Sequence, residues 1–333
     1  MEHRKFSNTD LTVSTIGLGC YGMSGAYGPA DDTESIATIR CALDLGINLL
    51  DTSASYGKGH NHRLIGEAIR GRRHEVVIHS KSGSPRDGNL DAVRGGGDPR
   101  YLRQACEQSL RNLGIETLDV FCMSRVDPNV PIEESVGGMA TLVKEGKTRF
   151  ISLSESSAES LRRGSAVHPL VSLQMEYSLF SRDAEEQGQI DACKELGVTM
   201  MAYAVLGRGM LSAGIPKVEE MAPDDIRVQL PRFQSANFER NLRLCSALEA
   251  IARQKKAALA QLSIAWPIAQ GLRAGVFIVP IPGAKSRKHL EENVRAADIV
   301  LTVDDLAEID RILPPGAASG PRYPIGQMNR LNV

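Results

Sequence analysis

Strand-like and helical segments alternate along almost the whole chain, and no other feature narrows the possible folds as much. Short apolar runs are each followed by a segment with the periodicity of an amphipathic helix. Strict alternation of this kind implies parallel strands joined by right-handed helical crossovers. Strands are predicted at residues 15–20, 47–51, 75–81, 118–123, 149–153, 171–175, 198–203 and 276–280. Helices are predicted at residues 33–45, 61–70, 99–113, 132–145, 158–163, 184–196, 238–270 (as two helices) and 286–297.

Eight strand–helix units in 333 residues predict an α/β fold of the (β/α)8 or TIM-barrel type. A β-hairpin at residues 4–6 and 11–14 is expected to precede the barrel. Residues 207–237 are expected to form a long loop after the seventh strand, and loops of this length are usually functional. We find no internal repeat and no low-complexity linker, so a single domain over residues 1–333 is expected. The Pro/Gly-rich tail from Pro314 is predicted either to cross the barrel mouth or to be disordered.

Composition excludes several classes of partner. The chain has 39 Lys and Arg residues and 40 Asp and Glu residues, which gives a net charge of −1. This charge lacks the positive excess that favours binding to nucleic acid or to an anionic membrane. The first residues, MEHRKFSNTD, lack the apolar stretch of a secretory signal, and no apolar run approaches the roughly 18 residues of a membrane span. The six cysteines are scattered without a Cys-x-x-Cys pair, which favours reduced thiols and a cytoplasmic protein.

The segment Gly17-Leu-Gly-Cys-Tyr-Gly22 satisfies the dinucleotide-binding pattern G-x-G-x-x-G after a strand. In a Rossmann fold the third glycine opens a helix at once, and an acidic residue follows about 20 positions later. Here a loop continues to residue 32, and the position of that acid falls inside a predicted helix. We therefore interpret these glycines as shaping the first loop of the barrel.

Polar residues stand where predicted strands end. Asp51, Lys81 and Ser124 end or directly follow successive strands, and Tyr56 lies in the loop after Asp51. In a barrel, the C-terminal strand ends meet at one mouth, where active sites form. A free phenol has a pKa of about 10, but an ammonium ~4 Å away favours its phenolate by on the order of 4 kcal/mol. Together, Asp51, Tyr56 and Lys81 predict a general acid or base. Such a group would suit a carbonyl that is reduced by hydride, because its oxygen needs a proton donor. The alternative is a structural Asp51–Lys81 ion pair with Tyr56 as a packing residue.

The segments IGLGCYGMSG, DTSASYG, KSG, LDVFCMSRVDP, QMEYSLFSRD, AYAVLGRGML and VPIPGAKSRKHLEENV occur in this order, and with them the chain resembles the aldo-keto reductase family. The resemblance implies a barrel without a Rossmann domain and NADPH or NADP+ extended across the strand ends. It also implies reversible reduction of an aldehyde or ketone to an alcohol. The family's catalytic aspartate, tyrosine and lysine fall on Asp51, Tyr56 and Lys81.

Ser124 departs from the family pattern, which carries a histidine that helps to hold and polarise the substrate carbonyl. Loss of one pre-aimed donor typically costs about 10² to 10³ in turnover. His79 lies two positions before Lys81 on the same face of its strand. One hypothesis is that His79 supplies part of the missing hydrogen bonding beneath Ser124. The other is that His79 fills the barrel and bonds to its neighbours.

Resemblance also suggests the cofactor residues. A helix start attracts phosphate, and Lys285, Ser286 and Arg287 would contact the 2′-phosphate there, which favours NADP over NAD. The remaining residues would bind the adenine, the carboxamide, the nicotinamide ring or the pyrophosphate; they are Gly22, Met23, Asp51, Ser154, Gln174, Tyr203, Leu206, Gly207, Arg208, Gly283, Glu292 and Asn293. Glu155 stands where many relatives have asparagine and is left out of this set.

The substrate pocket is expected to be largely aromatic, which suits a neutral carbonyl or alcohol compound. Its predicted residues are Tyr21, Tyr27, Phe180, Arg232 and Phe233. His60 and His62 form an isolated His-x-His pair, so no metal site is expected. Two other functions stay open: an NADP(H)-binding redox sensor with weak catalysis, which Ser124 would allow, and a hydrolytic barrel, which lacks a second strand-end carboxylate. The sequence leaves the oligomeric state undetermined.

Overall fold

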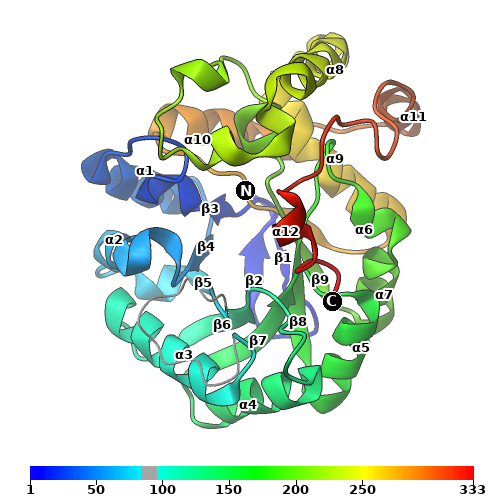
Figure 1. Cartoon of the computed structure of the whole chain (residues 1–333). Coiled ribbons are helices and arrows are strands. Elements are labelled where there is room, and N and C mark those ends of the chain that lie inside the picture. The colour runs from blue at the N-terminus through cyan, green and yellow to red at the C-terminus, as the bar shows by residue number, and fades with distance from the viewer. Residues whose placement is uncertain (84–95) are drawn as a thin grey trace.

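The chain forms a (β/α)8 barrel preceded by an antiparallel hairpin (Figure 1). The computed structural model describes residues 1–83 and 96–333. The hairpin consists of β1 (His3–Lys5) and β2 (Thr12–Ser14). Within the described residues the barrel sheet contains eight parallel strands in chain order: β3 (Leu18–Gly19), β4 (Leu49–Ser53), β5 (Val77–Ser82), β6 (Leu118–Met123), β7 (Thr148–Ser154), β8 (Leu170–Glu176), β9 (Thr199–Tyr203) and β10 (Ile278–Pro280).

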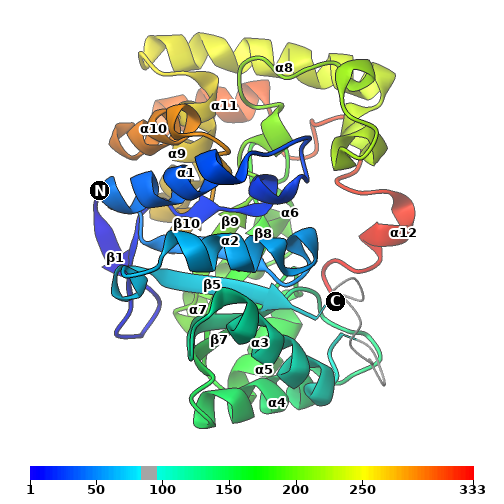
Figure 2. The ribbon, with the colours of Figure 1, turned by 90° about the vertical axis from the view of Figure 1, so that its left-hand side faces the viewer.

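Helices surround this sheet, as the two perpendicular views show (Figures 1 and 2). Their bounds are α1 (Asp32–Asp44), α2 (His60–Ala68), α3 (Pro99–Leu113), α4 (Ile132–Lys144), α5 (Ala158–Val167), α6 (Asp183–Glu186), α7 (Gln189–Leu196), α8 (Ser235–Gln254), α9 (Leu259–Ala274), α10 (Arg287–Val294), α11 (Val303–Ile312) and α12 (Ile325–Met328). In residues 1–83 and 96–333, no helix combines the length and the apolar character that a membrane crossing requires.

Local sequence signals set the ends of these helices, and α3 is a clear case. The side chain of Asp98 accepts a hydrogen bond from the backbone of Arg100, and Pro99 occupies the first turn, where its missing N–H costs nothing. Gly114 ends the helix in the left-handed conformation at φ 66°. Caps of this kind fix where each helix begins and ends.

The first and last barrel strands meet and close the sheet. The backbone N–H of Gly17 donates to the carbonyl of Pro280 at 2.9 Å, and that of Gly19 donates to Pro282 at 3.0 Å. Gly19 and Gly283 form a parallel bridge at the same seam. The prediction of a closed barrel is confirmed, and the glycines of the apparent dinucleotide motif lie in this seam and in the loop after it.

Strand alternation stacks the barrel interior into layers. Near the hairpin end the interior is apolar, where Leu49, Val77 and Val120 pack against Phe6 and Val13 of the hairpin segment. Successive side chains point to opposite faces of a strand, so the residues two positions after Leu49 and Val77 share this face, and they are the polar Asp51 and His79. The hairpin therefore plugs the bottom of the barrel, and the polar residues lie toward the open mouth.

Most predicted elements are present, although some differ from the prediction. Residues 238–270 do form two helices, α8 and α9, and the segment after β9 contains only 3-10 turns up to Phe233. The first strand is shorter than predicted. Helix α11 was not predicted, although Thr302 and Asp305 form a capping box before its apolar positions. The tail after α11 crosses the barrel mouth, which is one of the two outcomes expected for it.

The closure seam yields a stability prediction. A methyl group on Gly19 would lie 2.7 Å from the carbonyl oxygen of Ile281, so Gly19→Ala should force the seam apart. Overpacking of this kind costs about 1–3 kcal/mol, and the thermal unfolding midpoint should fall accordingly. Gly137→Ala in α4 is the control, because a methyl group there meets nothing within 4 Å. An equal midpoint for both variants would contradict the close approach at the seam.

Candidate functional site

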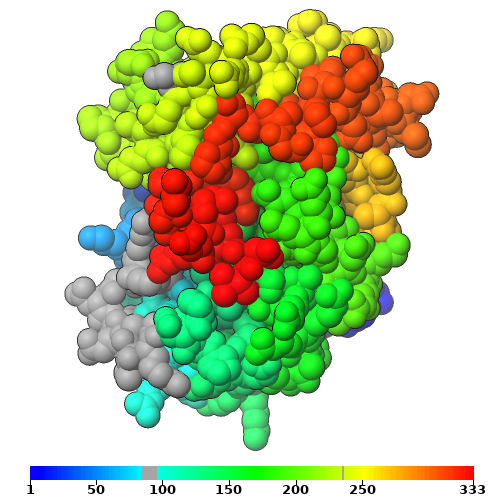
Figure 3. Space-filling view, turned by 45° about the vertical axis from the view of Figure 1, so that its right-hand side comes forward, coloured from blue at the N-terminus to red at the C-terminus, as the bar shows by residue number. Residues whose placement is uncertain are grey.

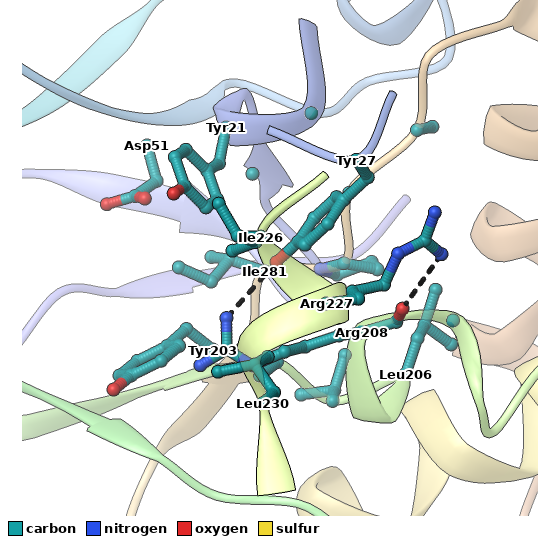
Figure 4. A pocket seen from close by; sticks show the side chains of 18 of the residues that line it. Tyr21, Tyr27, Asp51, Tyr203, Leu206, Arg208, Ile226, Arg227, Leu230 and Ile281 are labelled. Carbon is teal, nitrogen blue, oxygen red and sulfur yellow. Dashed lines mark hydrogen bonds between the residues drawn. The ribbon is translucent and has the colours of Figure 1, made fainter. Parts of the chain in front are cut away.

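A cavity of about 770 Å³ opens at the C-terminal ends of the barrel strands (Figure 4). Its size lies within the 300–1,000 Å³ that is typical of ligand pockets. All four predicted catalytic residues line it: Asp51, Tyr56, Lys81 and Ser124. The predicted strand ends therefore do meet at one place.

A buried ion pair forms the floor of the cavity. Lys81 Nζ lies 2.6 Å from both carboxylate oxygens of Asp51 and donates to the backbone carbonyl of Thr52 at 2.8 Å. Gln174 donates to Asp51 Oδ1 at 2.7 Å, and His79 Nδ1 lies 3.0 Å from the same oxygen. Asp51 is 3% exposed and Lys81 is 5% exposed, so water does not screen this pair. Residues from β4, β5 and β8 thus hold one carboxylate from different sides.

The charges in this network stabilise one another. Burial alone would raise the pKa of Asp51, but Lys81 and His79 outweigh it and hold that pKa below its usual value. Burial lowers the pKa of His79 even though Asp51 opposes this shift. Asp51 is therefore ionised and His79 neutral at pH 7.

Tyr56 lies beside the pair, but its hydroxyl makes a different contact from the one predicted. Lys81 Nζ lies over the face of the Tyr56 ring, 5.0 Å from its centroid. The ring also packs on Tyr21 with centroids 4.4 Å apart. Among the described residues, no hydrogen bond joins the Tyr56 hydroxyl to Lys81. Burial, followed by the Asp51 charge, raises the pKa of Tyr56 well above its usual value, so the phenol keeps its proton in this state.

His79 does not bond to Ser124. Its Nδ1 contacts Asp51, and its Nε2 lies 3.0 Å from the hydroxyl of Ser152 on β7. The structure therefore favours the second hypothesis, in which His79 fills the barrel and bonds to its neighbours. Ser124 is 9% exposed, and its backbone N–H donates to Ser82 at 2.6 Å.

Ten of the suggested cofactor residues line the cavity and five do not. Those in the lining are Gly22, Asp51, Gln174, Tyr203, Leu206, Arg208, Gly283, Lys285, Glu292 and Asn293. Outside the lining, Met23 is fully buried, Ser154 is 1% exposed, and Ser286 caps α10 by accepting from His289. Arg287 pairs with Glu34 at 2.9 Å, and Gly207 lies in the turn after Leu206. Their contact with a cofactor stays a prediction.

The start of α10 still offers positive charge to the cavity. Lys285 and Lys288 both line it, beside the backbone N–H groups at the helix start. Lys285 Nζ donates to the backbone carbonyls of Tyr27 at 2.9 Å and Pro29 at 3.0 Å, and burial lowers its pKa. An anion at this end of the cavity would favour the charged form of Lys285.

The predicted substrate residues divide in the same way. Tyr21 and Tyr27 line the cavity, and their rings meet edge to face at 5.5 Å. Phe180 and Phe233 are 5% and 1% exposed and belong to the core. Arg232 lies outside the lining and donates to the Ser181 hydroxyl at 2.7 Å. Sequence periodicity cannot distinguish an aromatic residue that packs in a loop from one that faces a ligand.

The chain tail covers part of the mouth and supplies residues that the sequence did not indicate (Figure 3). The Tyr323 hydroxyl lies 3.0 Å from that of Tyr203 and accepts from Arg208 at 2.8 Å. Arg322 reaches the buried carboxylate of Glu155 at 3.2 Å, and Glu155 also accepts from Tyr203 at 2.9 Å. The sequence signal for these contacts was weak: an arginine and a tyrosine, Arg322 and Tyr323, occur within a Pro/Gly-rich segment.

His60 and His62 face different partners. His60 lies 2.9 Å from Ser24 and 3.0 Å from Asp32, whereas His62 Nε2 bonds to the Ser80 hydroxyl at 2.9 Å in the interior. Within residues 1–83 and 96–333, His, Cys, Asp and Glu side chains form no group of three that could hold a metal ion.

A closed barrel with a long cavity, a buried lysine–aspartate pair and a tyrosine at its mouth defines a barrel oxidoreductase site. The chain belongs to the aldo/keto reductase family, whose model matches residues 15–314. It is therefore an oxidoreductase that acts on carbonyl or alcohol groups and uses a nicotinamide cofactor.

The relatives extend over nearly the whole chain. A probable aldo-keto reductase 1 from Glycine max is 37% identical over 321 residues, which cover 96% of this chain and 91% of the relative. The solved structure of the glycerol dehydrogenase AKR11B4 from Gluconobacter oxydans superposes with a TM-score of 0.80 at 26% identity, covering 93% of this chain and 94% of that one. The aldo-keto reductase AKR11C1 from Bacillus halodurans, in its holo form, shares the fold with a TM-score of 0.76 at 24% identity, covering 98% and 99% of the two chains.

Burial of His62 beneath the site predicts a pH dependence of stability. Burial, aided by the charge of Lys81, lowers the pKa of His62 to about 3. Because the unfolded chain takes up this proton near pH 6.5 and the folded chain does not, stability should fall as the pH drops below about 6.5. At pH 5 the loss from this residue is roughly 2 kcal/mol. His62→Gln should flatten the pH dependence of urea unfolding between pH 7 and 5, whereas His3→Gln at the exposed N-terminal hairpin should not.

Proposed function

We propose that this protein reduces an aldehyde or ketone to an alcohol, reversibly, with NADPH, and that Tyr56 donates the proton. The arrangement that carries this proposal is the Asp51–Lys81 pair under the ring of Tyr56, at the floor of a cavity with room for an extended dinucleotide. When bound, NADPH supplies the hydride. Side chains of this protein donate the proton and stabilise the charge that proton transfer leaves behind.

The protonation states suit a reduction. The raised pKa of Tyr56 keeps a proton on its hydroxyl at neutral pH, so the residue is ready to donate it. Once the proton leaves, the nearby ammonium of Lys81 stabilises the phenolate, and Asp51 holds that ammonium in place. Hydrogen bonds at catalytic sites often form or tighten only when ligands bind, so the present position of the Tyr56 hydroxyl is compatible with this role.

The charge at the α10 end of the cavity supports NADPH rather than NADH. Lys285 and Lys288 line this end, whereas the carboxylate of Glu34 is held by Arg287. A 2′-phosphate would meet two ammonium groups and a helix N-terminus there. Fluorescence titration should therefore show tighter binding of NADPH than of NADH, and Lys285→Met should reduce this difference. Equal affinities for the two cofactors in the unaltered protein would contradict the preference.

Tyr56→Phe tests the proton donor. The variant keeps the ring that packs on Tyr21 but loses the hydroxyl, so reduction of any carbonyl substrate should fall to background. NADPH affinity should stay within about twofold, because the hydroxyl makes no hydrogen bond to other described residues. The comparison requires steady-state rates on a panel of aldehydes and ketones, together with the titration. Activity retained at even a tenth of the original rate would assign proton donation to another group.

Ser124→His tests the departure from the family pattern. An added imidazole at the end of β6 should supply a donor to the substrate carbonyl and raise turnover of simple uncharged aldehydes, by up to about 10²-fold. Ser124→Ala is the matched control and should not raise the rate. A lower rate in the histidine variant, with intact NADPH binding, would show that the pocket is arranged around a small residue.

A further inference from the structure

Arg125 is an unassigned charged group in the cavity wall. It directly follows Ser124 at the end of β6, lines the cavity and is half-buried. Its Nη1 donates to the backbone carbonyl of Ser124 at 2.6 Å, which turns the guanidinium back along the strand end rather than out to solvent. Among the described residues, no carboxylate lies within 4.0 Å of this guanidinium.

Other arginines at the mouth differ in this respect. Arg208 pairs with Glu176 at 3.0 Å, Arg322 with Glu155 at 3.2 Å, and Arg232 lies 3.6 Å from Glu176. Arg322 also contacts the partly exposed Asp183 at 3.2 Å. Of the four arginines that line the cavity in the described part of the chain, Arg208 and Arg227 have a carboxylate partner, whereas Arg125 and Arg330 have none within 4.0 Å, and only Arg125 comes directly from the end of a barrel strand.

The surroundings keep this charge in place. Burial opposes the charged form of Arg125, but Tyr203, Tyr323 and Glu155 hold its pKa above the usual value. A guanidinium is always charged in proteins, and its planar fork of N–H groups fits a carboxylate in two parallel hydrogen bonds. Because this cation is partly desolvated and has no carboxylate within hydrogen-bond distance, an anionic ligand group gains more here than it would in water.

The position of Arg125 points to the substrate rather than to the cofactor phosphates. The backbone N–H of Ser124 bonds to Ser82, the residue after Lys81, so Arg125 follows a strand end that lies beside the strand end carrying Lys81. The cavity cations suited to phosphate, Lys285 and Lys288, come instead from the segment after β10. A ligand group bound by Arg125 therefore lies at the carbonyl end of the cavity.

We infer that Arg125 binds a carboxylate of the substrate, and that the substrate class is oxo acids, reduced to the corresponding hydroxy acids. This inference rests on the proposed function and narrows it. It replaces the sequence-based expectation of a neutral substrate, which was drawn from the aromatic residues alone. It also gives Ser124 a role, because a small side chain there leaves the adjacent guanidinium accessible.

Matched acid and ester substrates test this inference. 4-Carboxybenzaldehyde and methyl 4-formylbenzoate carry the same reacting aldehyde, but only the acid can pair with Arg125. The unaltered protein should show at least a tenfold higher kcat/KM for the acid. Arg125→Met should lower kcat/KM for the acid by about 10²-fold, mainly through KM, and change the value for the ester by less than threefold. For the acid, Arg125→Lys should give a kcat/KM between those of the unaltered protein and Arg125→Met, because lysine keeps the charge but loses the planar pair of N–H donors.

Controls separate recognition from stability and from the proposed function. Arg311→Met, at an exposed position of α11, should leave the acid-to-ester ratio unchanged. A parallel fall for acid and ester in Arg125→Met would indicate a structural role and overturn the inference, as would a preference of the unaltered protein for the ester. If neither compound is reduced, the proposed function fails. In that case, calorimetric titration of 4-hydroxymethylbenzoate into the NADPH-loaded protein tests the anion site by itself. Binding that Arg125→Met abolishes would support the site, and no binding to the unaltered protein would overturn it.

Discussion

The buried pair of Asp51 and Lys81 is the contact on which the rest of the site depends. Two charges that are at most 5% exposed stay in the interior only because each has the other, and removing one typically costs 3–5 kcal/mol. The partners that complete the pair, Gln174 and His79, come from β8 and β5. Gln174 reaches Asp51 from a strand that is not its neighbour in the sheet, so the curvature of the barrel is what brings all the partners to one carboxylate.

The layered barrel interior explains how a fold can tolerate such a pair. Leu49, Val77 and the hairpin residue Phe6 fill the bottom with apolar volume, which provides the burial that stabilises the sheet. Polar groups such as Asp51, His79 and Gln174 lie toward the other end, where they bond to one another between strands. Side chains alternate between the two faces of each strand, so the register between strands decides which residues face the barrel interior. A shift of one residue would turn the interior side chains of a strand toward the surrounding helices.

The sequence predicted the features that follow from the order of strands and helices along the chain. It did not predict contacts between side chains that are far apart in the sequence. Asp51, Lys81 and Ser124 could be placed at the mouth because strand ends of a barrel must meet there, and α8 and α9 could be separated by helix length alone. The pairing of Arg322 with Glu155 joins residues 167 positions apart, and no periodic pattern reports it. The same limit applies to the pairing of Arg287 with Glu34 and to the position of Lys81 over the face of the Tyr56 ring.

Glu155 shows how the tail and the site require each other. Its backbone adopts φ 55°, a left-handed conformation that is costly for a residue with a side chain, and its carboxylate is fully buried. Asparagine, the residue that the family resemblance leads one to expect here, would need no counter-charge. Glutamate needs one, and Arg322 supplies it from the tail while Tyr203 donates to the same oxygen. Because Tyr203 lines the ligand cavity, the charge that anchors the tail also fixes a side chain that faces the ligand, and the two features are best understood as a single adaptation.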